Sequence, residues 1–118
     1  MTPHLRLGRR GEDVAVRYLE GTGLVILARN WRCRGGELDV VATDRAQLVV
    51  CEIKTRSSTA YGTPAEAVDE AKAARIRGLA NAWRVERGLR PCPTRFDVVS
   101  VLWPPGESPQ VSHLMGAF

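Results

Sequence analysis

The apolar residues of the chain first follow a helical period, from Leu7 to Thr22. Val14, Ala15, Tyr18 and Leu19 fall on one face at this spacing, because residues three and four positions apart lie together on a helix. Two glycines close the segment and supply a stop signal. The pattern predicts that this segment is the first helix.

Three short segments rich in valine, isoleucine and leucine follow this helix. They are separated by Arg34-Gly35-Gly36 and by Asp44-Arg45-Ala46, which are typical of turns. Short connections of this kind join antiparallel neighbours. The pattern therefore predicts a three-stranded antiparallel meander, with strands at Leu24–Arg32, Glu37–Thr43 and Gln47–Thr55.

A second helical period runs from Pro64 to about Arg87, since proline is tolerated in a first helical turn and a glycine follows the last one. The segment Arg95–Trp103 then alternates and becomes apolar, as a buried strand does. A proline-rich turn separates it from a short strand near Val111. We expect the order αβββαβ with one added strand, in a single α/β domain over residues 1–118.

Composition limits the classes of partner and compartment. The 17 Lys and Arg residues exceed the 13 Asp and Glu residues, which favours a polyanionic partner without identifying it. Cys33, Cys51 and Cys92 lack the spacing of zinc ligands and fit reduced thiols. No segment approaches the roughly 20 apolar residues of a membrane span, and the first ten residues lack an export signal. We expect a cytoplasmic protein without membrane contact.

Two charged residues stand at the end of an otherwise apolar strand. The segment Leu48–Cys51 is apolar, and Glu52 and Lys54 follow it. Charges beside a buried strand need a partner or a use, because their desolvation is unfavourable. Side chains alternate along a strand, so these two point to the same face, about 6.5 Å apart along the chain.

The length of the preceding turn predicts what lies opposite these two residues. A hairpin loop of two or four residues pairs positions whose numbers sum to 91, so that Asp39 faces Glu52 and Glu37 faces Lys54. Opposed carboxylates repel each other, and a divalent cation such as Mg²⁺ or Mn²⁺ held between them relieves that repulsion. Such a metal lowers the pKa of a bound water, and Lys54 could stabilise charge developing on a phosphate.

Two simpler interpretations of these residues stay open. Glu52 and Lys54 can form a strand-end ion pair, with Asp39 as a solvated edge residue, since surface ion pairs are common and weak. Glu37 is most simply a charge at the start of a strand or a partner for Lys54.

A third charged position interrupts the second predicted helix. At 100° per residue, Val68, Ile76, Leu79 and Trp83 form an apolar stripe, and Lys72 falls in its middle. A lysine there either extends past the edge of the core to water or reaches the carboxylates or a substrate phosphate. The pattern does not decide between these alternatives.

The remaining polar candidates have simple structural explanations. Glu12 flanks the apolar stripe of the first helix and is explained as a solvated first-turn acid, favoured by the helix dipole. Asp97 interrupts an apolar strand and is interpreted as a structural acid paired with an arginine. No sequence neighbour of Tyr18, Tyr61 or His113 makes it a convincing nucleophile or base.

Arginines near the first helix are the candidate contacts to a polyanion. Arg9 and Arg10 lie close to the start of that helix, and Arg56 follows the strand that carries Glu52. Arginine forms two-point contacts with phosphate, which suits nucleic acid. An ordinary solvated surface explains the same residues equally well.

The charged motifs resemble a known nuclease pattern. Asp39, a spacer of twelve residues and Glu52-Ile53-Lys54 resemble the D-x(n)-ExK core of the PD-(D/E)xK nuclease superfamily, with Leu38 in place of the proline. The chain as a whole resembles the YraN-type family of small bacterial proteins, and further matches include Gly11-Glu12, Arg29-Asn30, Tyr61-Gly62, Lys72, Arg95-Phe96-Asp97-Val98 and His113.

This resemblance implies a restriction-endonuclease-like core, with a mixed central sheet flanked by helices, and a relationship to archaeal Holliday-junction resolvases, which are metal-dependent dimers. It implies Asp39 and Glu52 as metal ligands, Lys54 as the catalytic lysine, Glu12 as a metal or water ligand and Lys72 as a polar site residue.

These implications favour a Mg²⁺-dependent endonuclease, with Mn²⁺ as the other metal, acting on structured or branched DNA and working as a homodimer. The alternative is a catalytically silent nucleic-acid-binding module that acts through a partner. The two differ in one observable, because the module would bind nucleic acid in a salt-sensitive way without cleaving it.

Overall fold

The computed structural model describes residues 3–58 and 68–118, and the side chains from Arg6 onward within them. These residues form two helices and five strands in the predicted order αβββαβ with one added strand. The elements are α1 (Pro3–Gly21), β1 (Val25–Cys33), β2 (Gly36–Thr43), β3 (Leu48–Arg56), α2 (Glu70–Glu86), β4 (Thr94–Leu102) and β5 (Gln110–Leu114).

The five strands form one mixed sheet in the order β1-β2-β3-β4-β5. Only the β3–β4 pair is parallel, and the other three pairs are antiparallel. Two parallel neighbours need a long crossover, and the segment that contains α2 makes this connection. The predicted α/β class with a mixed central sheet is confirmed.

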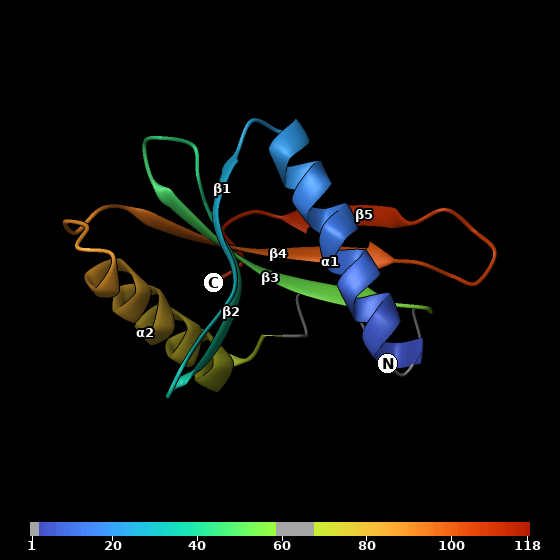
Figure 1. Cartoon of the computed structure of the whole chain (residues 1–118), viewed down its shortest axis with the longest axis horizontal. Coiled ribbons are helices and arrows are strands. Elements are labelled where there is room, and N and C mark those ends of the chain that lie inside the picture. The colour runs from blue at the N-terminus through green and yellow to red at the C-terminus, as the bar shows by residue number, and fades with distance from the viewer. Residues whose placement is uncertain (1–2, 59–67) are drawn as a thin grey trace.

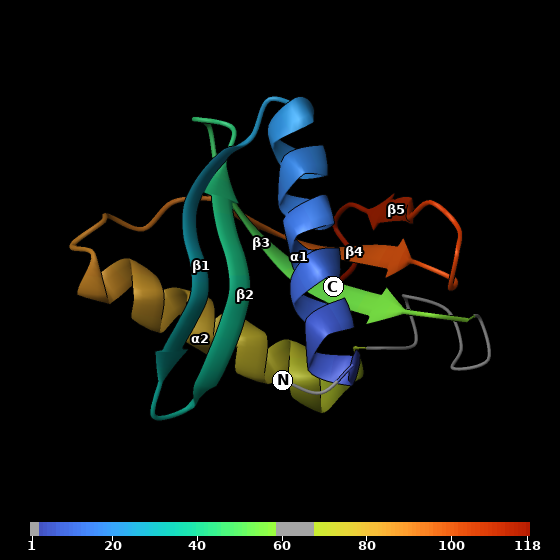
Figure 2. The same ribbon diagram turned by 45° about the vertical axis from the view of Figure 1, so that its right-hand side comes forward.

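The helices cover opposite faces of the sheet (Figures 1 and 2). Alternate residues of β3 divide between two apolar clusters, because successive side chains on a strand point to opposite faces. Val49 and Cys51 pack with Leu19 of α1, whereas Leu48 and Val50 pack with α2. No helix in the described part of the chain is long and apolar enough to cross a membrane.

The start of α2 differs from the prediction. The helix begins at Glu70, and Val68 and Asp69 precede it in a non-helical conformation, while Pro64 lies outside the described residues. Asp69 is the N-cap, and its carboxylate accepts the N–H of Lys72 at 2.8 Å. This hydrogen bond satisfies a donor that the first turn leaves without a helical acceptor, so the helix begins here.

The predicted register between β2 and β3 is confirmed, but it covers only half of β2. The pairs run from Val40–Cys51 to Thr43–Leu48, and their numbers sum to 91. The remainder of β2 stays paired with β1 as far as Gly36, and this ribbon bends toward α2, where Gly36 lies against Leu79. The sheet therefore opens between β2 and β3 just beyond Cys51 (Figure 2).

Candidate functional site

Asp39 occupies the point at which β2 separates from β3. Its neighbour Val40 is the last β2 residue in the ladder, and beyond it the N–H of Ile53 donates to Asp39 Oδ2 at 2.8 Å. A side-chain carboxylate thus accepts a strand N–H where the ladder has ended. This hydrogen bond fixes the carboxyl group of Asp39 at the point where the sheet opens.

The carboxyl groups of Asp39 and Glu52 lie close enough to interact, although the predicted Asp39–Glu52 pair is not part of the ladder, which ends at Val40–Cys51. The pKa of Asp39 is raised to about 7, first because burial disfavours the charged form and next because the Glu52 carboxylate lies beside it. The hydrogen bond from Ile53 acts in the opposite direction without reversing the shift. Asp39 is therefore not the solvated edge residue of the simpler interpretation. Two crowded carboxyl groups are stable together only when a proton or a cation lies near them.

Both lysines of the site converge on Glu52. Its Oε1 lies 2.8 Å from Lys72 Nζ and 3.7 Å from Lys54 Nζ. Burial lowers the pKa of Lys54, and the neighbouring Lys72 lowers it further. Burial also acts to lower the pKa of Lys72, but the contact with Glu52 outweighs it and the pKa is raised. Of the two alternatives for Lys72, contact with a carboxylate is confirmed.

Glu37 does not face Lys54, contrary to the register-based prediction. Its Oε2 forms an ion pair with Arg32 Nε at 2.7 Å, within the β1–β2 ribbon. The reason is the separation of β2 from β3 beyond Val40, so that Glu37 is not paired with a residue of β3. The predicted β2–β3 register therefore applies only from Val40–Cys51 to Thr43–Leu48.

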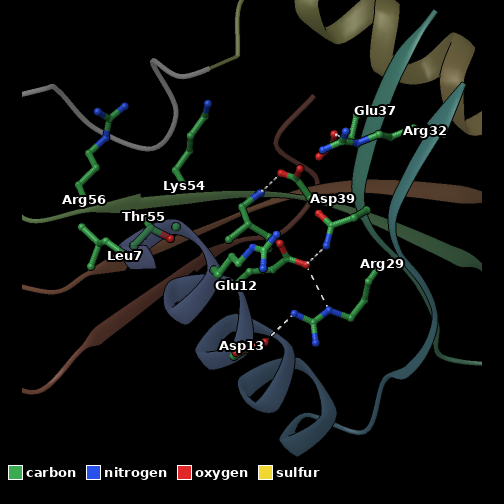
Figure 3. A pocket seen from close by; sticks show the side chains of 14 residues that line it. Leu7, Glu12, Asp13, Arg29, Arg32, Glu37, Asp39, Lys54, Thr55 and Arg56 are labelled. Atoms are coloured by element: carbon green, nitrogen blue, oxygen red, sulfur yellow. Dashed lines mark hydrogen bonds and ion pairs between the residues drawn. The ribbon is translucent and has the colours of Figure 1, made fainter. Parts of the chain in front are cut away.

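Glu12 is not a solvated acid either. Its Oε1 accepts hydrogen bonds from Arg29 Nε at 3.1 Å and Asn30 Nδ2 at 2.8 Å, and its side chain is only 13% exposed. Asn30 adopts a left-handed backbone conformation, with φ 51°. Figure 3 shows Glu12 and Asp13 reaching from α1 toward Arg29. The Glu12 charge also contributes to the raised pKa of Asp39.

An open pocket of about 1050 Å³ lies between α1, β1, β2 and the end of β3. Figure 3 shows Lys54 and Arg56 rising from the same face of β3, as alternate residues of a strand do. Glu52 and Lys72 do not line this pocket. The charged residues that line the pocket are Arg9, Glu12, Asp13, Arg29, Arg32, Glu37, Asp39, Lys54 and Arg56.

The predicted phosphate contacts divide between two sides of α1. Arg9 and Arg56 line the pocket that contains Asp39. Arg10 turns to the other side of the helix, and its guanidinium carbon lies 4.4 Å from the ring centroid of Trp103. The structure therefore brings only two of these three arginines to the pocket that contains Asp39.

Gly11 is a positional requirement that the sequence patterns did not single out. A Cβ at this position would collide with the side chain of Thr55 on β3, so only glycine lets α1 approach the strand this closely. The approach places Glu12 and Arg9 at the pocket. A glycine inside a helical period was the available signal, because glycine there is unfavourable without a packing reason.

A second polar cluster joins Asp97, His113 and Tyr18. Asp97 is fully buried and accepts two hydrogen bonds from Arg95, both at 2.9 Å, and one from the N–H of Gly116 at 3.0 Å. His113 Nε2 lies 2.7 Å from Asp97, and His113 Nδ1 lies 3.0 Å from the Tyr18 hydroxyl.

The predicted pairing of Asp97 with an arginine is confirmed. No sequence neighbour made Tyr18 or His113 a convincing nucleophile or base, and the local patterns did not predict their contact, which spans 95 positions of sequence. Tyr61 lies outside the described residues. The cluster does not contribute to the pocket that contains Asp39.

The donor set of the candidate site can be tested against a metal. Within residues 3–58 and 68–118, no three side chains among His, Cys, Asp and Glu form a group that could hold a metal ion alone. Asp39 and Glu52 therefore offer two carboxylates. Mg²⁺ is commonly held by one or two carboxylates and keeps several waters, so the pair fits this ion.

Comparison with known proteins gives a consistent family assignment. Residues 11–101 match the family model described as "Uncharacterised protein family UPF0102". A UPF0102 protein of Frankia alni is 57% identical over 112 residues, which cover 95% of this chain and 93% of the relative. A UPF0102 protein of Clavibacter michiganensis is 48% identical over 117 residues, which cover 99% of both chains.

Proposed function

The chain belongs to the uncharacterised protein family UPF0102, the YraN-type family that its motifs resemble, and we propose that it is a metal-dependent endonuclease. Its substrate is a nucleic acid, with structured or branched DNA as the first candidate. One arrangement supports the proposal above all others. The carboxyl groups of Asp39 and Glu52 and the ammonium groups of Lys54 and Lys72 converge beside a pocket whose lining includes Arg9 and Arg56.

Asp39 and Glu52 are the residues that would hold Mg²⁺ or Mn²⁺. Their carboxyl groups crowd each other at the opening between β2 and β3, and a divalent cation relieves the repulsion. When bound, such a metal acts as a Lewis acid on the phosphoryl oxygen and lowers the pKa of a water molecule.

The lysines of the site have different roles. Lys54 lines the pocket, so its ammonium group can contact a phosphate and stabilise the negative charge that develops during cleavage. Lys72 does not line the pocket and holds Glu52 at 2.8 Å, so it is a positioning residue. The N–H of Ile53 does the same for Asp39.

Two arginines in the lining of the pocket suit the phosphates of the rest of a nucleic-acid strand. Arg9 and Arg56 line the pocket and would bind neighbouring phosphates. Arg29 is held by Glu12 and Asp13. Glu12 therefore supports the pocket wall and adds negative charge near Asp39. From the resemblance to archaeal Holliday-junction resolvases, which are dimers, we propose a homodimer as the working form. A homodimer would present two such sites to a branched substrate.

Cleavage assays on a panel of branched, duplex and single-stranded DNA and RNA, with Mg²⁺ or Mn²⁺, test this function. We expect Lys54→Ala to lose about 100-fold or more in turnover while metal and nucleic-acid binding persist, because it removes transition-state stabilisation alone. Glu52→Gln is expected to lose both metal affinity and turnover. Glu20→Gln, which changes an exposed acid near the end of α1, is the control with unchanged activity.

Two results would contradict the proposal. Cleavage that survives Lys54→Ala, Asp39→Asn and Glu52→Gln alike would come from a copurified host nuclease. Salt-sensitive binding to nucleic acid without cleavage, under all metal conditions, would support the alternative of a binding module that acts through a partner.

A further inference from the structure

A second pocket, of about 650 Å³, lies on the other side of the N-terminal part of α1, against the turn between β4 and β5. It adjoins the first pocket, since Leu7 lines both. At the end of β3, Arg56 lines the first pocket and the next residue, Ser57, lines the second. A strand of nucleic acid leaving the candidate active site along β3 would therefore enter this second pocket.

The second pocket contains an arginine that is held in place by a tryptophan. The Arg10 guanidinium carbon lies 4.4 Å from the Trp103 ring centroid, a cation–π distance. Trp103 Nε1 donates to the Glu107 carbonyl oxygen at 2.9 Å, and the ring packs against the core cluster beneath α1. The ring is therefore fixed on one side, and the Arg10 guanidinium group lies over it.

The remaining walls combine positive charge with apolar surface. Arg6 precedes Arg10 by one helical turn and lines the same pocket, so two arginines face one acid, Glu107. Pro104, Pro105 and Pro109 supply apolar walls. A simple anion would be bound by the arginines and would make no use of the apolar proline walls.

This combination fits an unpaired nucleotide. Bases stack on aromatic rings and on the planes of arginine side chains, and arginine also binds phosphate. A base inside a duplex is already stacked on both faces, so only an unpaired base can enter such a pocket. The chemistry thus selects single-stranded nucleic acid over a continuous duplex.

We propose that the Arg10–Trp103 pocket binds an unpaired nucleotide of the substrate strand next to the bond that is cleaved. The substrate is then a nucleic acid with a single-stranded segment beside the cleavage position. The link to cleavage rests on the proposed endonuclease function, but binding in this pocket does not require cleavage.

Binding of the full chain to labelled oligonucleotides in EDTA, followed by fluorescence anisotropy, tests the pocket without cleavage. Oligothymidylate is compared with an abasic oligonucleotide of the same length and charge. We expect oligothymidylate to bind roughly 10-fold more tightly, because stacking adds to the phosphate contacts. Arg10→Gln and Trp103→Leu are each expected to reduce this preference to less than about 2-fold.

Arg17→Gln is the matched control, since it changes the same net charge on an exposed position of α1 that lines neither pocket. It should weaken binding of both oligonucleotides equally and keep the preference. Should Trp103→Leu fail to fold, Arg10→Gln carries the test alone, because Arg10 is exposed.

Equal affinity of the wild-type chain for the two oligonucleotides, or equal loss of preference in Arg10→Gln and Arg17→Gln, would overturn the proposal. The outcomes for the two proposals are separable. Cleavage without base-dependent binding would leave the endonuclease and reject this pocket. Base-dependent binding without cleavage would leave the pocket and reject the endonuclease.

Discussion

Two acids of the sheet, Asp97 and Asp39, have opposite environments. Burial acts to raise the pKa of Asp97, but its hydrogen bonds to Arg95, Gly116 and His113 outweigh burial, and the pKa is lowered. Burial also raises the pKa of Asp39, and there a second carboxylate raises it further, to about 7. Asp97 is thus paired with cationic and N–H donors of the protein, whereas Asp39 accepts one N–H and lies beside a second carboxylate, so that it favours a proton or a cation.

This difference separates a structural role from a functional one. A buried acid with complete hydrogen bonding contributes to folding and needs nothing from outside. Two acids held together against their repulsion lower stability, and proteins retain such arrangements where a ligand or a reaction uses them. Helix α1 serves both regions, with Glu12 near Asp39 and Tyr18 at the His113 end of the Asp97 cluster.

The largest effect on folding is expected from Asp97→Ala. The change leaves Arg95 and His113 without their buried acceptor, and breaking a buried charge pair in this way costs about 3–5 kcal/mol of unfolding free energy. Urea denaturation measures the loss, and Glu20→Gln should show no change of this kind. A loss below about 1 kcal/mol would mean that the cluster is not a structural element.

Gly11→Ala probes the helix that both regions share. Its Cβ would collide with Thr55, and overpacking of this kind costs roughly 1–3 kcal/mol in unfolding free energy. We also expect lower turnover, because α1 must move away from the pocket. Gly78→Ala in α2 is the control, since no atom lies near its Cβ position, and it should stabilise the helix by up to about 1 kcal/mol. Equal behaviour of both variants would contradict the close approach of α1.

Asp39→Asn should produce the smallest change in the free energy of unfolding, and it should stabilise the protein rather than destabilise it. The folded pKa of Asp39 is raised from 3.8 to about 7, so the folded state binds more protons and wild-type stability falls as pH rises between these values. The variant should therefore be more stable than wild type above pH 7, by on the order of 1 kcal/mol, with the difference vanishing near pH 4. Thermal melts across this pH range measure it.

The effect of a divalent metal on thermal stability further distinguishes the Asp39 site from the Asp97 cluster. Mg²⁺ or Mn²⁺ should raise the melting temperature of the wild type above pH 7, because a ligand of the folded state stabilises it, and Asp39→Asn should reduce that rise. An equal rise in the Asp39→Asn, Glu52→Gln double variant would place the metal elsewhere. A variant of Asp97 that retains its fold should keep the full rise, since that cluster contributes nothing to the pocket.

Local patterns in the sequence predicted most of the fold. Helical and strand periods, together with the proline-rich turn before β5, identified every helix and strand of the described chain, because burial of one face imposes a period on the residues themselves. The turn length between β2 and β3 predicted the register from Val40–Cys51 to Thr43–Leu48, since a short loop leaves few ways to pair its strands. The charged end of β3 indicated Glu52 and Lys54 for the same local reason.

Contacts between distant segments were decided by the tertiary structure. The β1–β2 ribbon separates from β3 to pack on α2, which removed Glu37 from Lys54 and left Asp39 beside Glu52. Periodicity records only that a residue is buried on some face, and it carries no information on which segment covers that face. Packing of α2 on the sheet therefore brought Lys72 to Glu52, and packing of α1 and β5 brought Tyr18 to His113.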